Sequence, residues 1–339
     1  MNRIQVLILF LAAVGCLTAC ANRMPPASSM ASPSESVSQM QSEAPLWEHS
    51  AAQQEDQPVE KGAVLHQSQG GTVLTGIPDP KSQQVFYLWE EENVPAVTEY
   101  TVNDRGYFDD PGFRPTITTF PVPQGVPVKG AVLVCAGGAF QYRSDSNEGT
   151  PVARALSELG YQSFVVDYRL HPYTQQEGAL DLARAVRFVR NNAEIYGIEP
   201  DDIAVMGFSA GGILAGEMLL NFDGTVSPAV LDPDYIPDEL DAVPADAAAD
   251  GMIYSFYGRL SVGTTDVELL RLGELPPTFY CYGTEDPFYR QFLANADAAE
   301  EAGVPVTRLQ LDGLPHGFGS EGGWIGAYDQ WLSEIFEKN

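Results

Sequence analysis

The sequence predicts an α/β fold, in which a mostly parallel central sheet is covered by helices on both faces. From about residue 130 onward, short apolar runs alternate with segments that carry helical periodicity. Strands that alternate with helices form parallel sheets with right-handed crossovers. No linker-like stretch interrupts the chain after about residue 100, which favours one large domain over two small ones.

The expected elements follow one another in a regular order. Strands are expected at 97–102, 115–122, 130–136, 161–167, 202–207, 252–257, 278–282 and 306–311. Helices are expected at 151–159, 178–196, 209–220, 288–302 and 324–336. Cys135 and Cys281 fall inside two of the expected strands, where a buried free thiol is the default. A disulfide between them is left open.

The first 19 residues have the pattern of a secretory signal peptide. Arg3 precedes an apolar run that is too short for a stable membrane span. The run leads into Leu17-Thr18-Ala19-Cys20, which resembles the lipobox of bacterial lipoproteins. That resemblance implies cleavage before Cys20 and a lipid anchor on its side chain. Cys16 is a weaker candidate, because Ala13 stands where leucine is expected, and plain secretion is the alternative.

The chain after the signal peptide is expected to divide into three segments. Residues 20–61 are rich in Ser, Pro, Ala, Gln and Glu, and this composition predicts a disordered tether. Residues 62–114 form an N-terminal extension, and residues 115–339 form the α/β domain. The tether and anchor predict a location outside the cytoplasm, at a bacterial membrane.

The strongly acidic composition limits the partners. Asp and Glu number 46 against 18 Lys and Arg, which gives a formal charge of −28. Such a chain is not expected to bind nucleic-acid phosphates or anionic lipid headgroups, since both interactions depend on clustered basic side chains. Contact with a membrane is therefore expected only through the N-terminal lipid anchor.

The segment Gly207-Phe208-Ser209-Ala210-Gly211 matches the pattern G-x-S-x-G. It follows an apolar strand and opens an expected helix, which is the context in which this pattern supplies a serine nucleophile. A side chain at either glycine would clash in so sharp a turn. Ser209 is therefore the predicted nucleophile, with its hydroxyl above the sheet.

A serine nucleophile needs a base, and the chain contains histidines at positions 49, 66, 171 and 316. The first two lie in the expected tether or just beyond it, and His171 comes well before the nucleophile. His316 lies between the last strand and the last helix, at the sheet edge where such sites assemble. Position and elimination therefore predict His316 as the base.

The acid that orients the imidazole is expected after the preceding strand. The turn Gly283-Thr284-Glu285-Asp286-Pro287 lies there and completes the chain order serine, acid, histidine. Asp286 is the predicted acid, because it stands one step deeper in the turn. Glu285 is the competing candidate, and helix capping is the structural alternative for either side chain.

An oxyanion that forms at a substrate carbonyl needs backbone N–H donors already in place. One donor is expected at Ala210, the residue after the nucleophile. Others are expected in the loop 136–140, where glycine lets the chain turn its amides inward. A purely structural turn is the alternative for this loop.

Together these residues resemble the esterase and lipase branch of the α/β-hydrolase superfamily, over roughly residue 115 to the end. The likeness is strongest to small bacterial carboxylesterases related to the hormone-sensitive-lipase and acetylxylan-esterase-like groups. Asp167-Tyr168-Arg169-Leu170 is also similar to the DYRL segment of those groups. The resemblance implies an α/β-hydrolase catalytic domain at 115–339 that cleaves acyl esters through an acyl-enzyme, with no metal or other cofactor.

The resemblance also locates the remaining oxyanion donors and reveals two departures. The family's His-Gly-Gly-Gly corresponds to Ala136-Gly137-Gly138-Ala139, which implies donors at the amides of Gly138 and Ala139. The leading histidine and the third glycine are missing here. The helical cap that usually precedes the first strand is not recognisable.

The predicted function is a serine carboxylesterase for short-chain acyl esters, with acetyl groups on xylan or other glycans as the specific substrate. An extracytoplasmic location and an acidic surface favour a neutral acylated carbohydrate. The pocket walls are expected to include Phe140, Phe208 and parts of 221–250. Two alternatives stay open: a serine peptidase of the prolyl-oligopeptidase type, and a non-catalytic, glycan-binding surface lipoprotein.

Overall fold

The computed structural model describes residues 78–100, 109–110 and 112–338. The predicted signal peptide, the lipidation site Cys20, the tether and the first part of the extension lie outside these residues. The described residues all fall within the compact unit 65–339. In this part of the chain, no helix combines the length and the apolar character that crossing a membrane requires.

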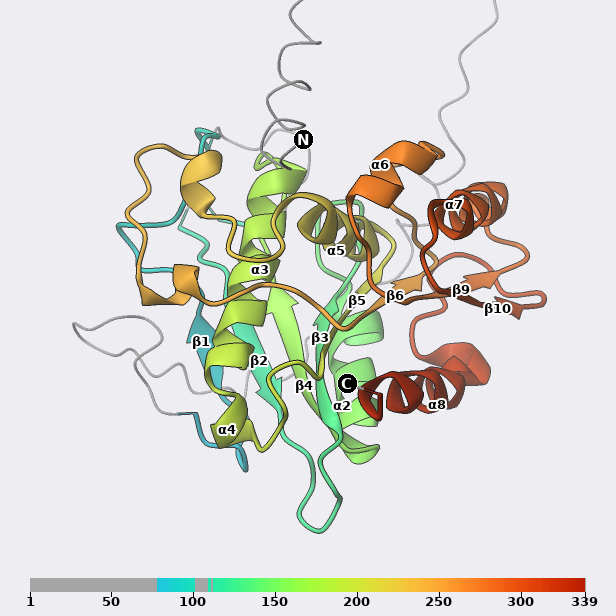
Figure 1. The fold of residues 1–339 in the computed structure, drawn as a ribbon, viewed down its shortest axis with the longest axis horizontal. Coiled ribbons are helices and arrows are strands. Elements are labelled where there is room, and N and C mark those ends of the chain that lie inside the picture. Colours follow the sequence, from blue (N-terminus) through green and yellow to red (C-terminus); the bar gives the residue numbers. More distant parts are fainter. Residues whose placement is uncertain (1–77, 101–108, 111, 339) are drawn as a thin grey trace, which may run out of the picture. The chain divides into compact units, whose positions relative to one another are not determined.

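An eight-stranded sheet forms the centre of this unit, in the order β1-β2-β4-β3-β5-β6-β9-β10 (Figure 1). Its strands are β1 (Val85–Tyr87), β2 (Thr116–Phe120), β3 (Gly130–Cys135), β4 (Tyr161–Asp167), β5 (Ile203–Phe208), β6 (Ala249–Ile253), β9 (Thr278–Gly283) and β10 (Val306–Leu311). The β1–β2 and β2–β4 pairs are antiparallel, and all other pairs are parallel. The predicted mostly parallel sheet is confirmed.

Helices cover both faces of this sheet. The α-helices of the described residues are α2 (Thr150–Glu158), α3 (Gln175–Asn191), α4 (Ala193–Tyr196), α5 (Ala210–Asn221), α6 (Val267–Leu272), α7 (Tyr289–Ala302) and α8 (Trp324–Phe336). Shorter turns are η2 (Asp145–Gly149), η3 (Pro228–Val230), η4 (Glu239–Ala242) and η5 (Glu321–Gly323). α3 packs with α5 on one face, and α2 packs with α8 on the other (Figure 1).

Local sequence explains why these elements form. Every residue of β3 and β5 is buried, as expected for parallel strands between two helix layers. α3 begins with a capping box, in which Thr174 accepts from the Glu177 amide and the Glu177 carboxylate accepts from the Thr174 amide. α7 ends at Gly303, whose φ of 97° is readily adopted only by glycine.

The structure departs from the expected elements in several places. The described part of the strand expected at 97–102 is not a strand. β1 and a short hairpin, β7 (Gly258–Arg259) with β8 (Val262–Gly263), were not expected. Strands of two or three residues are too short to show an alternating pattern, so only their partners in the fold reveal them.

β6 begins at Ala249, whereas the sequence placed this strand from Met252. An aspartate in a buried strand is unfavourable without a partner, so the sequence placed Asp250 in the preceding loop. Its side chain is fully buried, and its Oδ2 accepts a hydrogen bond from the Tyr257 hydroxyl at 2.9 Å. Its Oδ1 has no hydrogen-bond partner among the described residues. Burial raises the pKa of Asp250 to about 7.

We expect Asp250→Asn to remove part of the pH dependence of stability. Between pH ~4 and about 7, the folded protein keeps a proton on Asp250 that the unfolded chain has lost. The stability contributed by this proton is complete below pH ~4 and is lost as the pH rises through about 7. From pH 5 to 8, the unfolding free energy of the wild type should fall by roughly 3 kcal/mol relative to the variant. Urea unfolding of both proteins measures this difference, and parallel pH dependences would contradict it.

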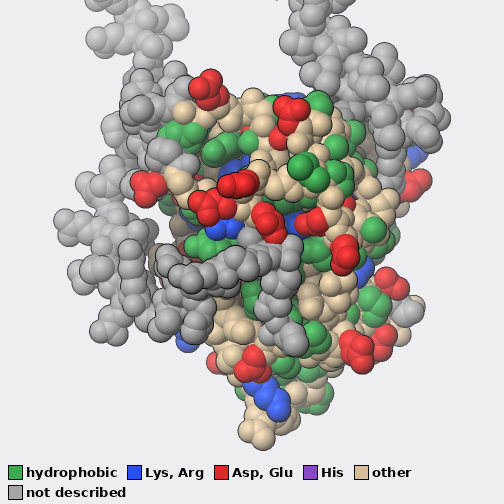
Figure 2. Space-filling model, turned by 90° about the vertical axis from the view of Figure 1, so that its left-hand side faces the viewer, with side chains coloured by type: hydrophobic (Ala, Val, Ile, Leu, Met, Phe, Trp, Pro, Cys, Tyr) green, Lys and Arg blue, Asp and Glu red, His purple; other side chains and the backbone are tan. Residues whose placement is uncertain are grey.

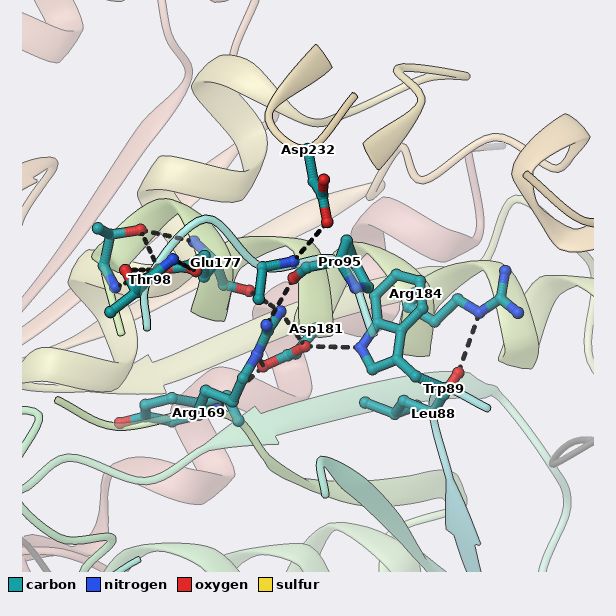
Figure 3. Close-up of polar contacts among 12 residues, drawn as sticks. Leu88, Trp89, Pro95, Thr98, Arg169, Glu177, Asp181, Arg184 and Asp232 are labelled. Carbon is teal, nitrogen blue, oxygen red and sulfur yellow. Dashed lines mark hydrogen bonds and ion pairs between the residues drawn. The ribbon is translucent and has the colours of Figure 1, made fainter. Parts of the chain in front are cut away.

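A buried polar network fixes the segment before β2 to α3 (Figure 3). Arg169 forms an ion pair with Asp181 at 2.9 Å and donates to the carbonyl of Pro95 at 2.6 Å. The indole Nε1 of Trp89 donates to the same aspartate at 2.7 Å. Because a buried charge is stable only with partners, this network accounts for the arginine of the DYRL segment.

The two described cysteines do not form a disulfide. Cys135 in β3 and Cys281 in β9 are buried free thiols. β5 and β6 lie between their strands, which puts three strand spacings, about 14 Å, between them. That separation is too large for a disulfide.

Candidate active site

Loops that follow parallel strands bring the predicted site residues to one edge of the sheet. Ser209 follows β5, Asp286 follows β9 and His316 follows β10. The loop 136–140 follows β3, and Tyr254 follows β6. Because the carboxyl ends of parallel strands meet at one edge, residues far apart in the sequence converge there.

Ser209 stands on a sharp turn between β5 and α5, with φ 49° and ψ −118°. A Cβ at Gly207 would lie 2.3 Å from the backbone of Gly211, and a Cβ at Gly211 would lie 2.1 Å from the Cys135 carbonyl oxygen. Both glycines are therefore required by close backbone approach. The hydroxyl of Ser255 donates to the Ser209 carbonyl at 2.7 Å and helps to hold the turn.

His316 connects Ser209 to a buried acid. Its Nε2 lies 2.9 Å from Ser209 Oγ, and its Nδ1 lies 2.6 Å from Asp286 Oδ2. Asp286 is only 5% exposed, and its Oδ1 accepts from the Phe288 amide at 2.8 Å. Since the carboxylate accepts the Nδ1 proton, the lone pair of Nε2 faces the serine hydroxyl.

The competing residues lie apart from this chain of hydrogen bonds. Glu285 is exposed, while its neighbour Asp286 is the carboxylate that contacts His316. His171 packs edge-on against Phe140, with 5.8 Å between the ring centroids. The histidines at 49 and 66 lie outside the described residues.

The loop 136–140 has an uncommon backbone conformation. Its φ angles are 127° at Gly138, 55° at Ala139 and 58° at Phe140. Two of these residues are not glycine, so the surrounding structure must hold the loop in place. The amides of Gly138, Ala139 and Ala210 have no hydrogen-bond partner among the described residues. They are therefore available to a bound oxygen.

The segment after β4 holds both ends of this loop. The hydroxyl of Tyr168 donates to the Ala136 carbonyl at 2.6 Å, and the His171 amide donates to the Phe140 carbonyl at 2.9 Å. Arg143 donates in turn to the Tyr168 carbonyl at 2.8 Å. The DYRL segment thus supports the loop, a role that its resemblance to related sequences did not reveal.

A small pocket opens beside Ser209 and His316. Its other lining residues are Ile213, Tyr254, Ser255, Phe256, Leu260, Ser261 and Phe288. The expected walls Phe140, Phe208 and 221–250 do not line it, and both phenylalanines are buried in the core. The chain after β6 and the β7–β8 hairpin occupy that position instead.

Sequence reasoning missed two residues beside the site. Tyr254 packs against the His316 ring with 5.0 Å between centroids, and its hydroxyl donates to Glu148 at 2.7 Å. Glu148 also accepts from the Gly137 amide. A glutamate in a loop and a tyrosine after a strand are common in any protein, so only the fold marks them. Glu148 is only 4% exposed, which is unusual because carboxylates are rarely buried unless they have partners.

The strand order, the sharp turn at Ser209 and the positions of the loops define an α/β-hydrolase fold. Residues 121–226 match the family model BD-FAE. The solved structure of an acetyl ester-xyloside bifunctional hydrolase from Caldicellulosiruptor lactoaceticus superimposes with a TM-score of 0.54 and 23% sequence identity. The match covers 75% of this chain and 96% of that one, and it shows a shared fold.

Two relatives by sequence are esterases. An acetylxylan esterase from Xylanibacter ruminicola is 26% identical over 219 residues, which cover 60% of this chain and 44% of that protein. An arylesterase from Saccharolobus solfataricus is 27% identical over 209 residues, which cover 56% of this chain and 68% of the relative. The chain thus spans less than half the length of the acetylxylan esterase. The chain therefore has an α/β-hydrolase fold and is similar in sequence to these two esterases.

Proposed function

We propose that the protein is a serine carboxylesterase that cleaves short-chain acyl esters. The observation that carries this proposal is the continuous hydrogen-bonded chain from Ser209 Oγ through His316, at 2.9 Å, to the buried carboxylate of Asp286, at 2.6 Å. The similarity to an acetylxylan esterase and an arylesterase supports the same reaction class.

In the proposed mechanism, Ser209 Oγ attacks the ester carbonyl carbon while His316 Nε2 takes the hydroxyl proton. Asp286 stabilises the resulting imidazolium through Nδ1. The tetrahedral intermediate carries its negative charge on the former carbonyl oxygen. The amides of Gly138, Ala139 and Ala210 donate to that oxygen.

The intermediate collapses as the bond between carbon and the alcohol oxygen breaks. His316 returns its proton to the leaving alcohol, and the acyl group stays on Ser209. Water then enters, loses a proton to His316 and attacks the acyl-enzyme carbonyl. The proton returns to Ser209 Oγ as the carboxylic acid leaves.

The pocket beside Ser209 supports a short acyl group. Its walls are mainly apolar, and the space that water-sized groups can occupy between them is about 20 Å³. That volume is little more than the ~10–15 Å³ that one water-sized group needs. Such a small space favours an acetyl methyl over a long alkyl chain. One relative is an acetylxylan esterase, and the solved structure is an acetyl ester-xyloside hydrolase. These similarities favour an acetylated glycan as the ester that is cleaved.

The charge of the surface supports a neutral substrate. Figure 2 shows Asp and Glu side chains spread over one face of the molecule, with few Lys and Arg. Such a surface favours a neutral glycan ester over nucleic acid or anionic lipid.

The signal-like sequence at the N-terminus supports a location outside the cytoplasm. We propose that lipid-modified Cys20 and the residues up to 61 tether the esterase to a bacterial membrane, with plain secretion as the alternative.

Three assays of the purified protein test this function. It should hydrolyse p-nitrophenyl acetate, and a fluorophosphonate should label Ser209. It should also release acetate from acetylated xylan. Turnover of p-nitrophenyl acetate without release from xylan would reject the glycan and keep the esterase. A Ser209 that does not react with the fluorophosphonate would favour a binding protein.

Leu260 should determine which length of acyl chain the enzyme prefers. It lines the pocket from the tip of the β7–β8 hairpin and is 38% exposed, so a smaller residue there should not disturb the core. We expect Leu260→Ala to raise kcat/KM for the butyrate ester relative to the acetate ester by about tenfold, because each buried methylene contributes about 0.8 kcal/mol. Kinetics on p-nitrophenyl esters of two to six carbons measure this change.

Val262→Ala is the matched control for this prediction. Val262 lies on the same hairpin, is 63% exposed and does not line the pocket. Its variant should keep the wild-type chain-length profile. Equal shifts in both variants would mean that the hairpin, and not the Leu260 side chain, sets the preference.

A further inference from the structure

Glu148 is a buried acid beside the active site that takes no part in the proposed reaction. It lies in η2 and is 4% exposed. Its Oε2 accepts a hydrogen bond from the Gly137 amide at 2.5 Å, and its Oε1 accepts from the Tyr254 hydroxyl at 2.7 Å. Burial raises the pKa of this carboxyl, against the opposing effect of the two hydrogen bonds.

On one side, Glu148 holds the peptide between Ala136 and Gly137, at the start of the loop 136–140. A Cβ at Gly137 would lie 2.9 Å from the Cβ of Ser209, so this peptide sits directly against the nucleophile. The orientation of the Gly137 amide determines where the next two amides, of Gly138 and Ala139, point. Since the loop holds a strained conformation, it needs such external contacts to persist.

On the other side, η2 contacts the loop that carries His316. The Tyr254 ring packs on the imidazole, and its hydroxyl oxygen accepts from the Gly319 amide at 3.2 Å. The side chain of Asn147, next to Glu148, donates to the Gly317 carbonyl at 3.0 Å. The histidine loop is therefore joined to η2 at two points, on either side of Phe318.

We propose that Glu148 is a positioning residue that holds the loop 136–140 and the loop that carries His316 in a fixed arrangement around Ser209. This role rests on the serine esterase function proposed above. Donors to the oxyanion act only in the transition state and depend on accurate placement. Glu148 is not among the residues that line the pocket. Its loss should therefore lower kcat and leave KM nearly unchanged.

Two variants of Glu148 distinguish the effect of its hydrogen bonds from the effect of the volume that its side chain fills. Glu148→Ala should lower kcat on p-nitrophenyl acetate by about 100-fold, with KM within about threefold of the wild type. Glu148→Gln should recover activity to within about fivefold of the wild type. Its Oε1 can accept from the Gly137 amide, and its Nε2 can donate to the Tyr254 hydroxyl oxygen.

Asp250→Asn is the matched control, because Asp250 is also a buried carboxyl that accepts from a tyrosine hydroxyl. It should keep the wild-type kcat. The proposal is overturned if Glu148→Ala keeps kcat within about twofold, or if only KM changes. Should Glu148→Ala fail to give a cooperative melting curve, Tyr254→Phe replaces it. That variant keeps the ring on His316, is expected to lower kcat about tenfold, and overturns the proposal if kcat is unchanged.

The rate at which a fluorophosphonate labels Ser209 gives the same comparison without an ester substrate. Negative charge develops on the phosphonyl oxygen, so the same backbone amides assist the reaction. A wild type that is labelled but cleaves no ester contradicts the esterase function alone. The labelling rates of the Glu148 variants then decide its role: slower labelling of Glu148→Ala supports it, and an unchanged rate overturns it.

Discussion

In the Ser209→Ala variant, kcat for p-nitrophenyl acetate is expected to fall by about a million-fold, to the residual rate that the backbone donors and binding supply. The variant loses the atom that attacks the ester, so no acyl-enzyme forms. Because Ser209 lies in the turn after β5 and is only partly buried, the substitution should leave the melting temperature nearly unchanged. Stopped-flow and steady-state kinetics, together with loss of fluorophosphonate labelling, measure the effect.

The His316→Ala variant and the Ser209/His316 double variant test whether the residues act as a unit. Groups that act together in one step show strongly non-additive effects, so the double variant should be about as slow as either single variant. Ser157→Ala is the control, because Ser157 is a buried serine on α2 that contacts the Arg154 carbonyl. Additive losses, or activity that survives in Ser209→Ala, would contradict the proposed nucleophile.

In the Asp286→Asn variant, kcat is expected to fall by about 10⁴-fold. Asp286 is buried and accepts the Nδ1 proton of His316 at 2.6 Å. An amide in its place favours the imidazole tautomer whose Nε2 carries the proton, and such a nitrogen cannot accept the proton of Ser209. The volume of the side chain is preserved, so the fold should remain intact.

Glu285→Gln is the matched control for this variant. It removes one carboxylate at the neighbouring position, but this residue is exposed, and kcat should stay within about twofold of the wild type. Single-turnover kinetics on both variants compare the acylation rates. A large loss in Glu285→Gln combined with a small loss in Asp286→Asn would reverse the assignment of the acid.

Much of the fold follows from local sequence pattern. The strand β4 and the helices α2 and α8 lie within a residue or two of their expected positions, because their apolar periodicity is strong and their neighbours are turns. β6 was misplaced because Asp250 interrupts its apolar run, and the partner that makes this aspartate tolerable, Tyr257, is known only from the fold.

The pocket was harder to predict than the residues at its centre. Its walls come largely from loops, namely residues 254–256 after β6 and the turn of the β7–β8 hairpin, and loops carry no recognisable period. A pocket forms wherever packing leaves space, and that depends on how loops from several strands meet. The expected walls Phe140 and Phe208 instead fill the core.

The sequence by itself determined the order of most strands and helices and marked Ser209, Asp286 and His316 as residues that the fold would bring together. It could do so because the glycine turn, the chain order and the scarcity of histidine are local or countable features. Only the tertiary structure decided that Asp286 and not Glu285 faces the imidazole. It also decided that Glu148 and Tyr254 join two loops around the site. The contact between Glu148 and Tyr254 links residues 106 positions apart in the chain, and no local pattern encodes a contact over that separation.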